Sequence, residues 1–420
     1  MSAPAAPSAH QLQLLQGASA LFAALIADMD AAQNRVQIET YLFDLHGDAA
    51  AVTQALVRTA QRGVQVQVLV DGVGTDEVPQ TTLDELRQAG VRWRVFSPLH
   101  ARWGKLAMLS GTKWRRLHRK LIVIDSRVAY CGGINILDDH YDPNHGQLDA
   151  PRFDFSVRLQ GPVVTAIEAA TSVLWQRLQA VQSAKARDFS SAWHTWRKKP
   201  PHDSPALAAA PGPSASTAVT DTTGLHADRV ELLLRDNLRY RTRIEHAYRR
   251  AIGAAQREII IANAYFLPGR KLRKALITAA RRGVRVRLLL QGKHEYFIQY
   301  HGTRPLYRSL LAAGVEIHEY AASFLHAKVA VIDADTPRAW STVGSSNLDP
   351  LSLLLAREAN VGIYGSAFAQ ALRKPLEAAM AECQRIDPQQ YLNRPWPKRF
   401  MEHLAYGLMR LAVLLSGKRY

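Results

Sequence analysis

The sequence LHRKLIVID at residues 117–125 returns, little changed, as LHAKVAVID at residues 325–333. Both copies belong to a longer repeat, in which AAQNRVQIETYLF at 31–43 matches AAQREIIIANAYF at 254–266. In each half, helical segments alternate with short strands rich in β-branched residues, which predicts an α/β fold. We expect two halves related by a pseudo-twofold axis, each a mixed β-sheet flanked by α-helices, with one active site shared between them.

The domain boundaries follow from this repeat and from a change in composition. We predict that residues 1–182 form the first half and residues 229–392 the second. Residues 183–228 are rich in Pro, Ala and Ser and lack hydrophobic periodicity, which predicts a flexible linker. Residues 393–420 are expected to form an amphipathic segment that contacts a membrane.

The composition limits the class of protein. Lys and Arg total 53 against 36 for Asp and Glu, a net charge of +17, which favours polyanionic partners such as nucleic acid or anionic lipid, although solubility is the simpler explanation. Two cysteines, Cys131 and Cys383, exclude a disulfide framework and a cysteine-based zinc site; we expect Cys131 to be a small buried residue. Neither a secretory pattern nor a membrane-spanning stretch is evident, so we expect a cytoplasmic location or the cytoplasmic face of a membrane.

The repeated motif carries side chains suited to phosphodiester chemistry. His118 and Lys120 lie two residues apart, so on a strand they share one face, and His326 and Lys328 repeat the spacing. One histidine can attack phosphorus while another supplies a proton, and lysines can neutralise the phosphoryl oxygens without a metal. A single His-x-Lys is weak evidence, but two copies within a repeat favour a catalytic site.

Each motif is followed by further polar residues at similar spacing. Asp125 and Asp333 close the strands, and Gly-x-x-Asn then ends at Asn135 and Asn347. The glycines permit close backbone approach to a ligand, and the asparagine amides can donate to an oxyanion.

The double His-x-Lys-x4-Asp with Gly-x-x-Asn resembles the signature of the phospholipase D superfamily, over about residues 20–180 and 230–385. The second half is most similar to the B type of bacterial cardiolipin synthases, through IIIANAYFLPG, TVGSSNLDPLSLLLAREANV and Arg235-Asp236-Asn237. The first half agrees through HRKLIVID, GGIN and FDFSVRLQGPVV.

The resemblance implies a mechanism without metal or cofactor, in two steps, through a covalent phosphohistidine. It implies that His118 is the nucleophile and that His326 is the general acid and later the base. The other site residues that it implies are Lys120, Lys328, Asn135 and Asn347 on the phosphoryl oxygens, Asp154 and Glu358 as residues that orient the histidines, and Asp125 and Asp333 as structural members of the catalytic group.

The activity that the resemblance implies is phosphatidyl transfer from one phosphatidylglycerol to a second, with release of glycerol. Two alternatives remain open: a phospholipase D-like hydrolase of phospholipid or nucleic acid, and an inactive basic scaffold on membranes. Complete motifs in both halves count against the scaffold. The expected partner is an anionic phospholipid membrane containing phosphatidylglycerol, and nucleic acid is a less favoured partner.

Two segments are candidates for membrane contact at the cytoplasmic face. Residues 99–116 hold Trp103 and Trp114 among basic residues, a composition typical of a lipid headgroup zone, although a plain surface loop has the same pattern. Residues 399–420 repeat apolar side chains at helical spacing, which indicates a helix lying on a membrane or on the protein's own core.

The segment LDDHYDPNHGQLD at 137–149 gathers aspartates and histidines. It lacks the spacing of a calcium loop, so we expect a solvated loop and no metal site.

Overall fold

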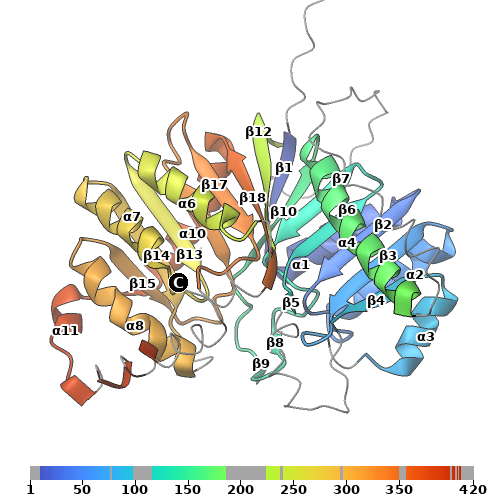
Figure 1. The fold of residues 1–420 in the computed structure, drawn as a ribbon, viewed down its shortest axis with the longest axis horizontal. Coiled ribbons are helices and arrows are strands. Elements are labelled where there is room, and N and C mark those ends of the chain that lie inside the picture. Colours follow the sequence, from blue (N-terminus) through green and yellow to red (C-terminus); the bar gives the residue numbers. More distant parts are fainter. Residues whose placement is uncertain are drawn as a thin grey trace, which may run out of the picture.

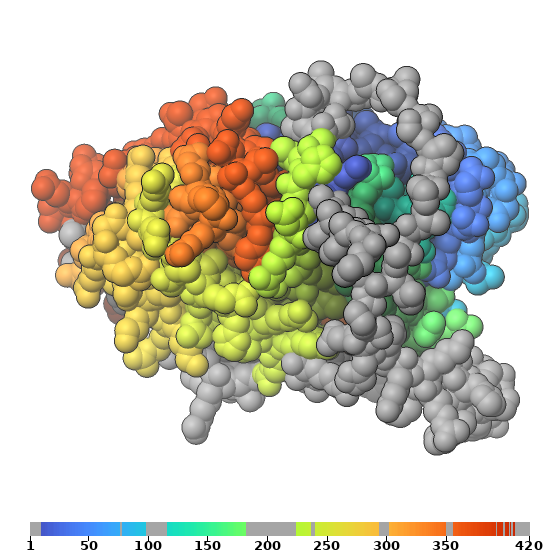
Figure 2. Space-filling view, turned by 90° about the horizontal axis from the view of Figure 1, so that it is seen from above, coloured from blue at the N-terminus to red at the C-terminus, as the bar shows by residue number. Residues whose placement is uncertain are grey.

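The computed structural model describes residues 10–75, 78–97, 116–185, 224–236, 240–293, 297–349, 356–397, 400–402, 404 and 406–407. These residues form two α/β halves that lie side by side (Figures 1 and 2). The first half is blue to green and the second yellow to red. The predicted fold class is confirmed.

The first half contains an eight-stranded sheet in the order β11-β1-β10-β7-β6-β2-β3-β4. Its strands are β1 (His10–Gln16), β2 (Arg35–Thr40), β3 (Gln65–Asp71), β4 (Arg92–Phe96), β6 (Lys120–Ile124), β7 (Val128–Gly132), β10 (Phe155–Gln160) and β11 (Leu225–Ala227). A small hairpin joins β8 (Tyr141–Asp142) to β9 (Gly146–Gln147). The helices are α1 (Gly17–Asp30), α2 (Ala49–Gln61), α3 (Gln80–Gln88) and α4 (Val163–Lys185).

The second half repeats this arrangement in the strand order β12-β18-β17-β16-β13-β14-β15-β19. Its strands are β12 (Arg229–Arg235), β13 (Glu258–Asn263), β14 (Arg285–Gln291), β15 (Glu316–Tyr320), β16 (Lys328–Ile332), β17 (Trp340–Gly344), β18 (Ala356–Tyr364) and β19 (Gln384–Arg385). The helices are α6 (Arg243–Ala254), α7 (Arg270–Arg281), α8 (Phe297–Leu311), α10 (Ser366–Ala381) and α11 (Pro388–Leu392). The short strand β5 (Arg116–Leu117) comes from the first half but pairs with β18 of the second.

Both sheets are mixed in the same way. β2 pairs parallel with β3 and antiparallel with β6, and β13 pairs parallel with β14 and antiparallel with β16. Every residue of β6 (KLIVI) and β16 (KVAVI) is buried, because both faces of each sheet are covered. That burial explains why these strands read as continuous apolar runs and not as an alternation.

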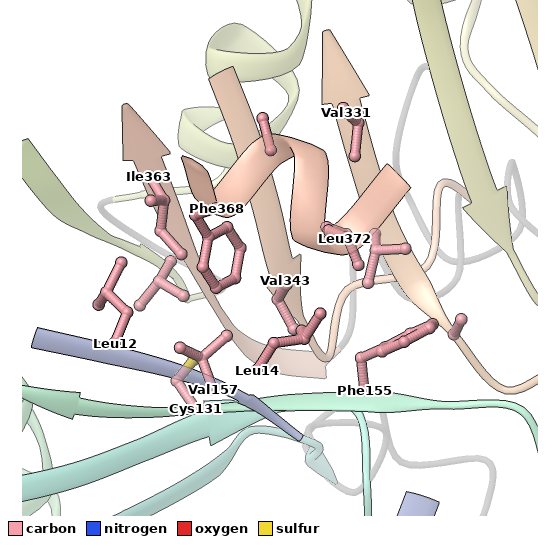
Figure 3. Close-up of a cluster of buried hydrophobic side chains, with 14 of the residues drawn as sticks. Leu12, Leu14, Cys131, Phe155, Val157, Val331, Val343, Ile363, Phe368 and Leu372 are labelled. Atoms are coloured by element: carbon pink, nitrogen blue, oxygen red, sulfur yellow. The ribbon is translucent and has the colours of Figure 1, made fainter. Parts of the chain in front are cut away.

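The described residues form three large hydrophobic cores, one within each half and one that joins the halves. The outer faces of the sheets pack against α1 and α2 in the first half and against α6, α7 and α8 in the second. The inner faces share one core, in which Cys131 and Val157 of the first half approach Val343 and Phe368 of the second (Figure 3). Each such large apolar side chain contributes about 1.5–3 kcal/mol when buried, so this shared core ties the halves into one unit. Cys131 is fully buried, as predicted.

The predicted linker was too long at both ends. α4 continues to Lys185, and β11 at Leu225–Ala227 pairs with β1, so the chain after the linker first completes the sheet of the first half. Residues 186–223 lie outside the described residues, as do residues 99–115 and 408–420 of the two predicted membrane-contact segments. No helix in the described part of the chain is both long and apolar enough to span a bilayer.

Candidate active site

Each histidine is held by the backbone of the opposite half. The amide N–H of His118, which follows β5, donates to the carbonyl of Arg357 at 3.0 Å. The amide N–H of His326 donates to the carbonyl of Phe153, also at 3.0 Å. Arg357 and Phe153 directly precede the two acidic residues predicted to orient the histidines, so each histidine is fixed beside a carboxylate from the other half.

The side chains pair in the same crossed manner. Nδ1 of His118 lies 3.1 Å from Oε2 of Glu358, and Nδ1 of His326 lies 2.6 Å from Oδ2 of Asp154. A carboxylate at Nδ1 favours the tautomer that carries its proton there and leaves the lone pair on Nε2. Neither half holds a complete pair, so the site exists only where the two halves meet.

The two lysines lie beside both histidines. Lys120 Nζ donates to the His118 carbonyl at 2.8 Å, Lys328 Nζ donates to the His326 carbonyl, and both side chains are buried. Burial lowers the pKa of His326 well below its ordinary value, and the charges of Lys328 and Lys120 lower it further. Burial likewise lowers the pKa of Lys120 to about 7. The structure thus brings both motifs to one buried, positively charged site suited to a phosphodiester anion.

The two carboxylates differ in their electrostatic environments. Burial raises the pKa of the Asp154 carboxyl to about 7, against the opposing effects of Lys328 and the Phe155 amide. Burial also acts to raise the pKa of Glu358, but the nearby His118 and Lys120 outweigh it and leave that pKa below its ordinary value. Burial thus favours a proton on the Asp154 side of its pair near neutral pH, whereas His118 and Lys120 favour the ionised form of Glu358.

The two asparagines are placed differently. Asn135 is partly buried, and its Oδ1 accepts from the Leu42 amide at 3.3 Å, which leaves its amide group to donate. Asn347 is buried, and its Oδ1 has no hydrogen-bond partner among the described residues. Both side chains therefore keep hydrogen-bonding capacity for a ligand.

Comparison with known proteins agrees with this geometry. A family model described as "Cardiolipin synthase, PLD-like domain" matches residues 25–146 and 248–380. The chain is 36% identical to cardiolipin synthase B of Escherichia coli K12 over 413 residues, which cover 97% of this chain and 90% of the relative. The chain belongs to this family. It is also 27% identical to cardiolipin synthase 1 of Staphylococcus aureus COL, covering 92% of this chain and 70% of that one.

Solved structures extend the likeness of fold. The phosphatidylserine synthase of Haemophilus influenzae Rd KW20 superposes with a TM-score of 0.62 at 13% identity, covering 96% of this chain and 94% of that one. At such low identity the match shows the two-half phospholipase D-like fold alone.

Two of the residues predicted for the family site lie elsewhere. The Asp125 carboxylate accepts from the backbone amides of residues 33–35 at 2.7–2.8 Å, and Asp333 does the same for residues 256–258 at 2.8–3.0 Å. Each aspartate follows the last residue of its strand, so roughly 16 Å of extended chain separates it from the lysine of its motif. The expectation that they belong to the catalytic group is therefore corrected: they fix the starts of β2 and β13.

The glycines of Gly-x-x-Asn, Gly132 and Gly344, make room for neighbouring strands, because a Cβ on them would lie 2.1 Å from Ser156 and 2.2 Å from Asn360. A Cβ on Gly133 would lie 2.4 Å from the Asp154 carboxylate, so this glycine makes room for a residue that orients His326 and not for a ligand. The equivalent residue in the second half is Ser345, whose hydroxyl donates to Glu358 at 2.5 Å. Ser345 was missed by the sequence analysis, although its place opposite Gly133 in the repeat was a usable signal.

The sequence patterns also did not indicate several other residues that hold the histidines in place. The Tyr41 ring centroid lies 5.0 Å from that of His118. Asp71, the last residue of β3, accepts from the Leu117 amide at 2.7 Å. Gln291, the last residue of β14, accepts from the Leu325 amide at 3.2 Å. Each half thus fixes the residue that directly precedes its histidine.

A buried ion pair lies directly under the first motif. Arg119, between His118 and Lys120, donates to both carboxylate oxygens of Glu39, one of them at 2.9 Å. Both side chains are buried, and the repeat places Ala327 and Ala262 at the equivalent positions. The fold itself therefore does not require the ion pair.

The segment 137–149 forms the β8–β9 hairpin with its flanks. Three of its four aspartates accept from backbone amides: Asp138 from His140, Asp142 from Asn144, and Asp139 from Ala18. Within the described ranges, no three His, Cys, Asp or Glu side chains gather in a way that could hold a metal ion.

Proposed function

We propose that this protein is a cardiolipin synthase, which transfers a phosphatidyl group from one phosphatidylglycerol to a second and releases glycerol. The observation that carries the proposal is the crossed pairing of His118 with Glu358 and His326 with Asp154, beside two buried lysines. The family to which the chain belongs supports the choice of lipid.

In the first step, His118 forms the covalent intermediate. Its Nε2 attacks phosphorus, and the bond from phosphorus to the headgroup glycerol oxygen breaks. His326, protonated on Nε2, gives its proton to that departing oxygen. Lys120 and Lys328, with the amides of Asn135 and Asn347, neutralise the phosphoryl oxygens, so these residues of the chain supply the charge stabilisation.

The second step reverses the first with a new alcohol. His326 takes the proton from a free hydroxyl of the second phosphatidylglycerol, and the resulting alkoxide attacks phosphorus. The bond from phosphorus to His118 breaks, and cardiolipin leaves. Water in place of the alcohol would give phosphatidic acid, so a synthase needs a site that limits water.

Product analysis tests this proposal and separates it from its alternatives. The purified protein is incubated with phosphatidylglycerol vesicles. Cardiolipin with an equal amount of glycerol supports the synthase. Phosphatidic acid as the main product would instead indicate a lipid hydrolase, cleavage of DNA without lipid turnover would indicate a nuclease, and no turnover of either would indicate the inactive scaffold.

The proposed location is peripheral, on the cytoplasmic face of the membrane. The C-terminal region supports it: Trp396, Phe400 and Leu404 are 75%, 62% and 52% exposed. On the other side of the segment, Glu402 is buried and bound to Arg394 at 2.7 and 3.0 Å. An apolar surface held outward by a buried ion pair suits the interfacial zone of a bilayer.

The double variant Phe400→Ser/Leu404→Ser tests whether the C-terminal region contacts the membrane. The double variant should bind phosphatidylglycerol vesicles more weakly and unfold at the same temperature as the parent. Unchanged sedimentation with vesicles would count against membrane contact by this segment.

A further inference from the structure

The helices α6 and α7 both belong to the second half (Figure 1). A groove with positively charged walls lies between them. Its volume is about 980 Å³, within the range of ligand-binding clefts. The basic residues that line it are Arg243, Arg249 and Arg250 from α6, Lys271 and Lys274 from α7, and Arg282 just after α7. Glu231 is the one acidic residue in its lining.

Most of this positive charge is not neutralised locally. Glu231 is already engaged by Arg250 at 3.1 Å and by the Tyr364 hydroxyl at 2.9 Å. Arg282 donates to three backbone carbonyls at the end of α6 and the residues after it, which are neutral partners. Lys271 and Lys274 are exposed and form no ion pair with any residue that the structure describes. The groove therefore carries an excess of cations that can bind an anion.

The first half shows that the fold does not demand this excess. There the equivalent helices are α1 and α2, and Asp30 at the end of α1 binds Arg58 of α2 at 3.0 Å. The repeat aligns Asp30 with Gly253 and Arg58 with Thr278. A Cβ built on Gly253 meets nothing within 4 Å, so the position of the lost carboxylate is open space. The basic groove is thus specific to the second half.

The groove begins at the edge of the sheet that carries the active site. β12 ends at Arg235, the register partner of Glu358, and α6 follows it. β13 ends at Asn263, the register partner of Lys328, and α7 follows it. The first turns of both helices, with Arg243 and Lys271, therefore lie towards the same edge of the sheet as Glu358 and Lys328.

We infer that this groove binds the phosphodiester headgroup of an anionic phospholipid, at a place separate from the catalytic histidines. Arginine can present two parallel N–H donors to phosphate oxygens, and lysine adds point charges. The location at the active-site edge favours a headgroup of the bilayer over a nucleic acid strand. Bound there, the lipid holds the second half on an anionic membrane. The inference rests on the proposed function only in that the substrate is a membrane lipid.

A pair of double variants tests the inference. Lys271→Ala/Lys274→Ala removes two charges from the groove, and Arg338→Ala/Lys374→Ala removes two exposed charges from other parts of the second half. Both proteins are sedimented with phosphatidylcholine vesicles that contain phosphatidylglycerol. Loss of the two groove lysines should weaken binding about thirtyfold, since each lysine near an anionic surface contributes about 1 kcal/mol. The control variant should bind within about twofold of the parent.

Three results would overturn the inference. Equal losses in both variants would mean diffuse attraction by the net charge. Unchanged vesicle binding in the groove variant would mean that the groove faces away from lipid. A groove variant that loses binding to a single-stranded oligonucleotide while keeping that to vesicles would assign the groove to nucleic acid. The assay measures binding alone, so failure of the parent protein to make cardiolipin would refute the proposed function without affecting this result.

Discussion

The two histidine pairs share one geometry but not one electrostatic character. His118 faces a glutamate that stays ionised, whereas His326 faces an aspartate whose pKa burial raises to about 7. A carboxylate that keeps its charge holds Nδ1–H and leaves a lone pair on Nε2, as a nucleophile needs. A pair that keeps a proton near neutral pH suits a general acid. Two halves with the same backbone fold can thus hold a nucleophile and a general acid, because the carboxylates beside the two histidines differ in charge.

The residues packed around the two histidine motifs also differ between the halves. Under the first motif lie the buried Glu39–Arg119 pair and the Tyr41 ring, and the repeat places alanines at all three equivalent positions of the second half. The second half therefore shows which version of each position the fold accepts. Variants that introduce the alanines of the second half into the first half separate effects on folding from effects on the reactivity of His118.

The largest expected effect comes from removing either histidine. His118→Ala and His326→Ala should each lower turnover of phosphatidylglycerol at least about 10⁴-fold, because neither half holds both nucleophile and acid. The two variants should differ when the substrate is a phosphodiester with a good leaving group such as nitrophenol. His326→Ala should then still accumulate a phosphohistidine, since no proton is needed, and His118→Ala should not.

The site of the covalent group decides between the two roles. Acid-labile phosphate, located by mass spectrometry, should be found on His118 in the His326→Ala protein. Phosphate on His326 in the His118→Ala protein would exchange the assignments and would contradict the electrostatic comparison.

The next effect concerns stability. Glu39→Ala or Arg119→Ala alone leaves an unpaired charge in a buried place and should lower the free energy of unfolding by about 3–5 kcal/mol. The double variant copies Ala262 and Ala327 and should regain most of that loss. Urea unfolding followed by circular dichroism measures all three. A double variant as unstable as the sum of the singles would show that the first half needs the ion pair to fold.

The carboxylates should govern the pH dependence. As pH rises through about 7, both the pair of His326 and Asp154 and the Lys120 ammonium lose a proton, so kcat should fall on the alkaline side. Asp154→Asn removes the carboxyl ionisation and should lower kcat about a hundredfold. Its alkaline limb should move to lower pH, because burial lowers the pKa of His326 itself.

Glu358→Gln is the matched control for that profile. It should slow turnover but keep the Asp154 ionisation, so its alkaline limb should move less than that of Asp154→Asn. The measurement is kcat against pH with a soluble short-chain phosphatidylglycerol, and an Asp154→Asn profile that keeps the parent's limb would assign the limb to another group.

The sequence predicted the fold well because a repeat reports the same hydrophobic pattern twice. It could not predict the crossed pairs. The repeat aligns Asp154 with Glu358 and His118 with His326, but whether a carboxylate meets the histidine of its own half or of the other depends on how the sheets pack. Asp125 shows the converse error, since regular spacing to His118 suggested a shared site, whereas the strand between them carries it to a distant turn.

The smallest expected effect is a change in product ratio. Tyr41 packs against the His118 ring, and Gly74 makes this possible, because a Cβ there would lie 2.8 Å from the Tyr41 ring. Tyr41→Ala copies Ala264 and opens one side of His118 to water, so the ratio of cardiolipin to phosphatidic acid should fall severalfold, while Tyr41→Phe keeps the ring and should keep the ratio. Both products arise from the same phosphohistidine, so partial unfolding lowers their amounts but not their ratio. A normal ratio in the alanine variant would mean that the lipid itself, and not this ring, keeps water from the intermediate.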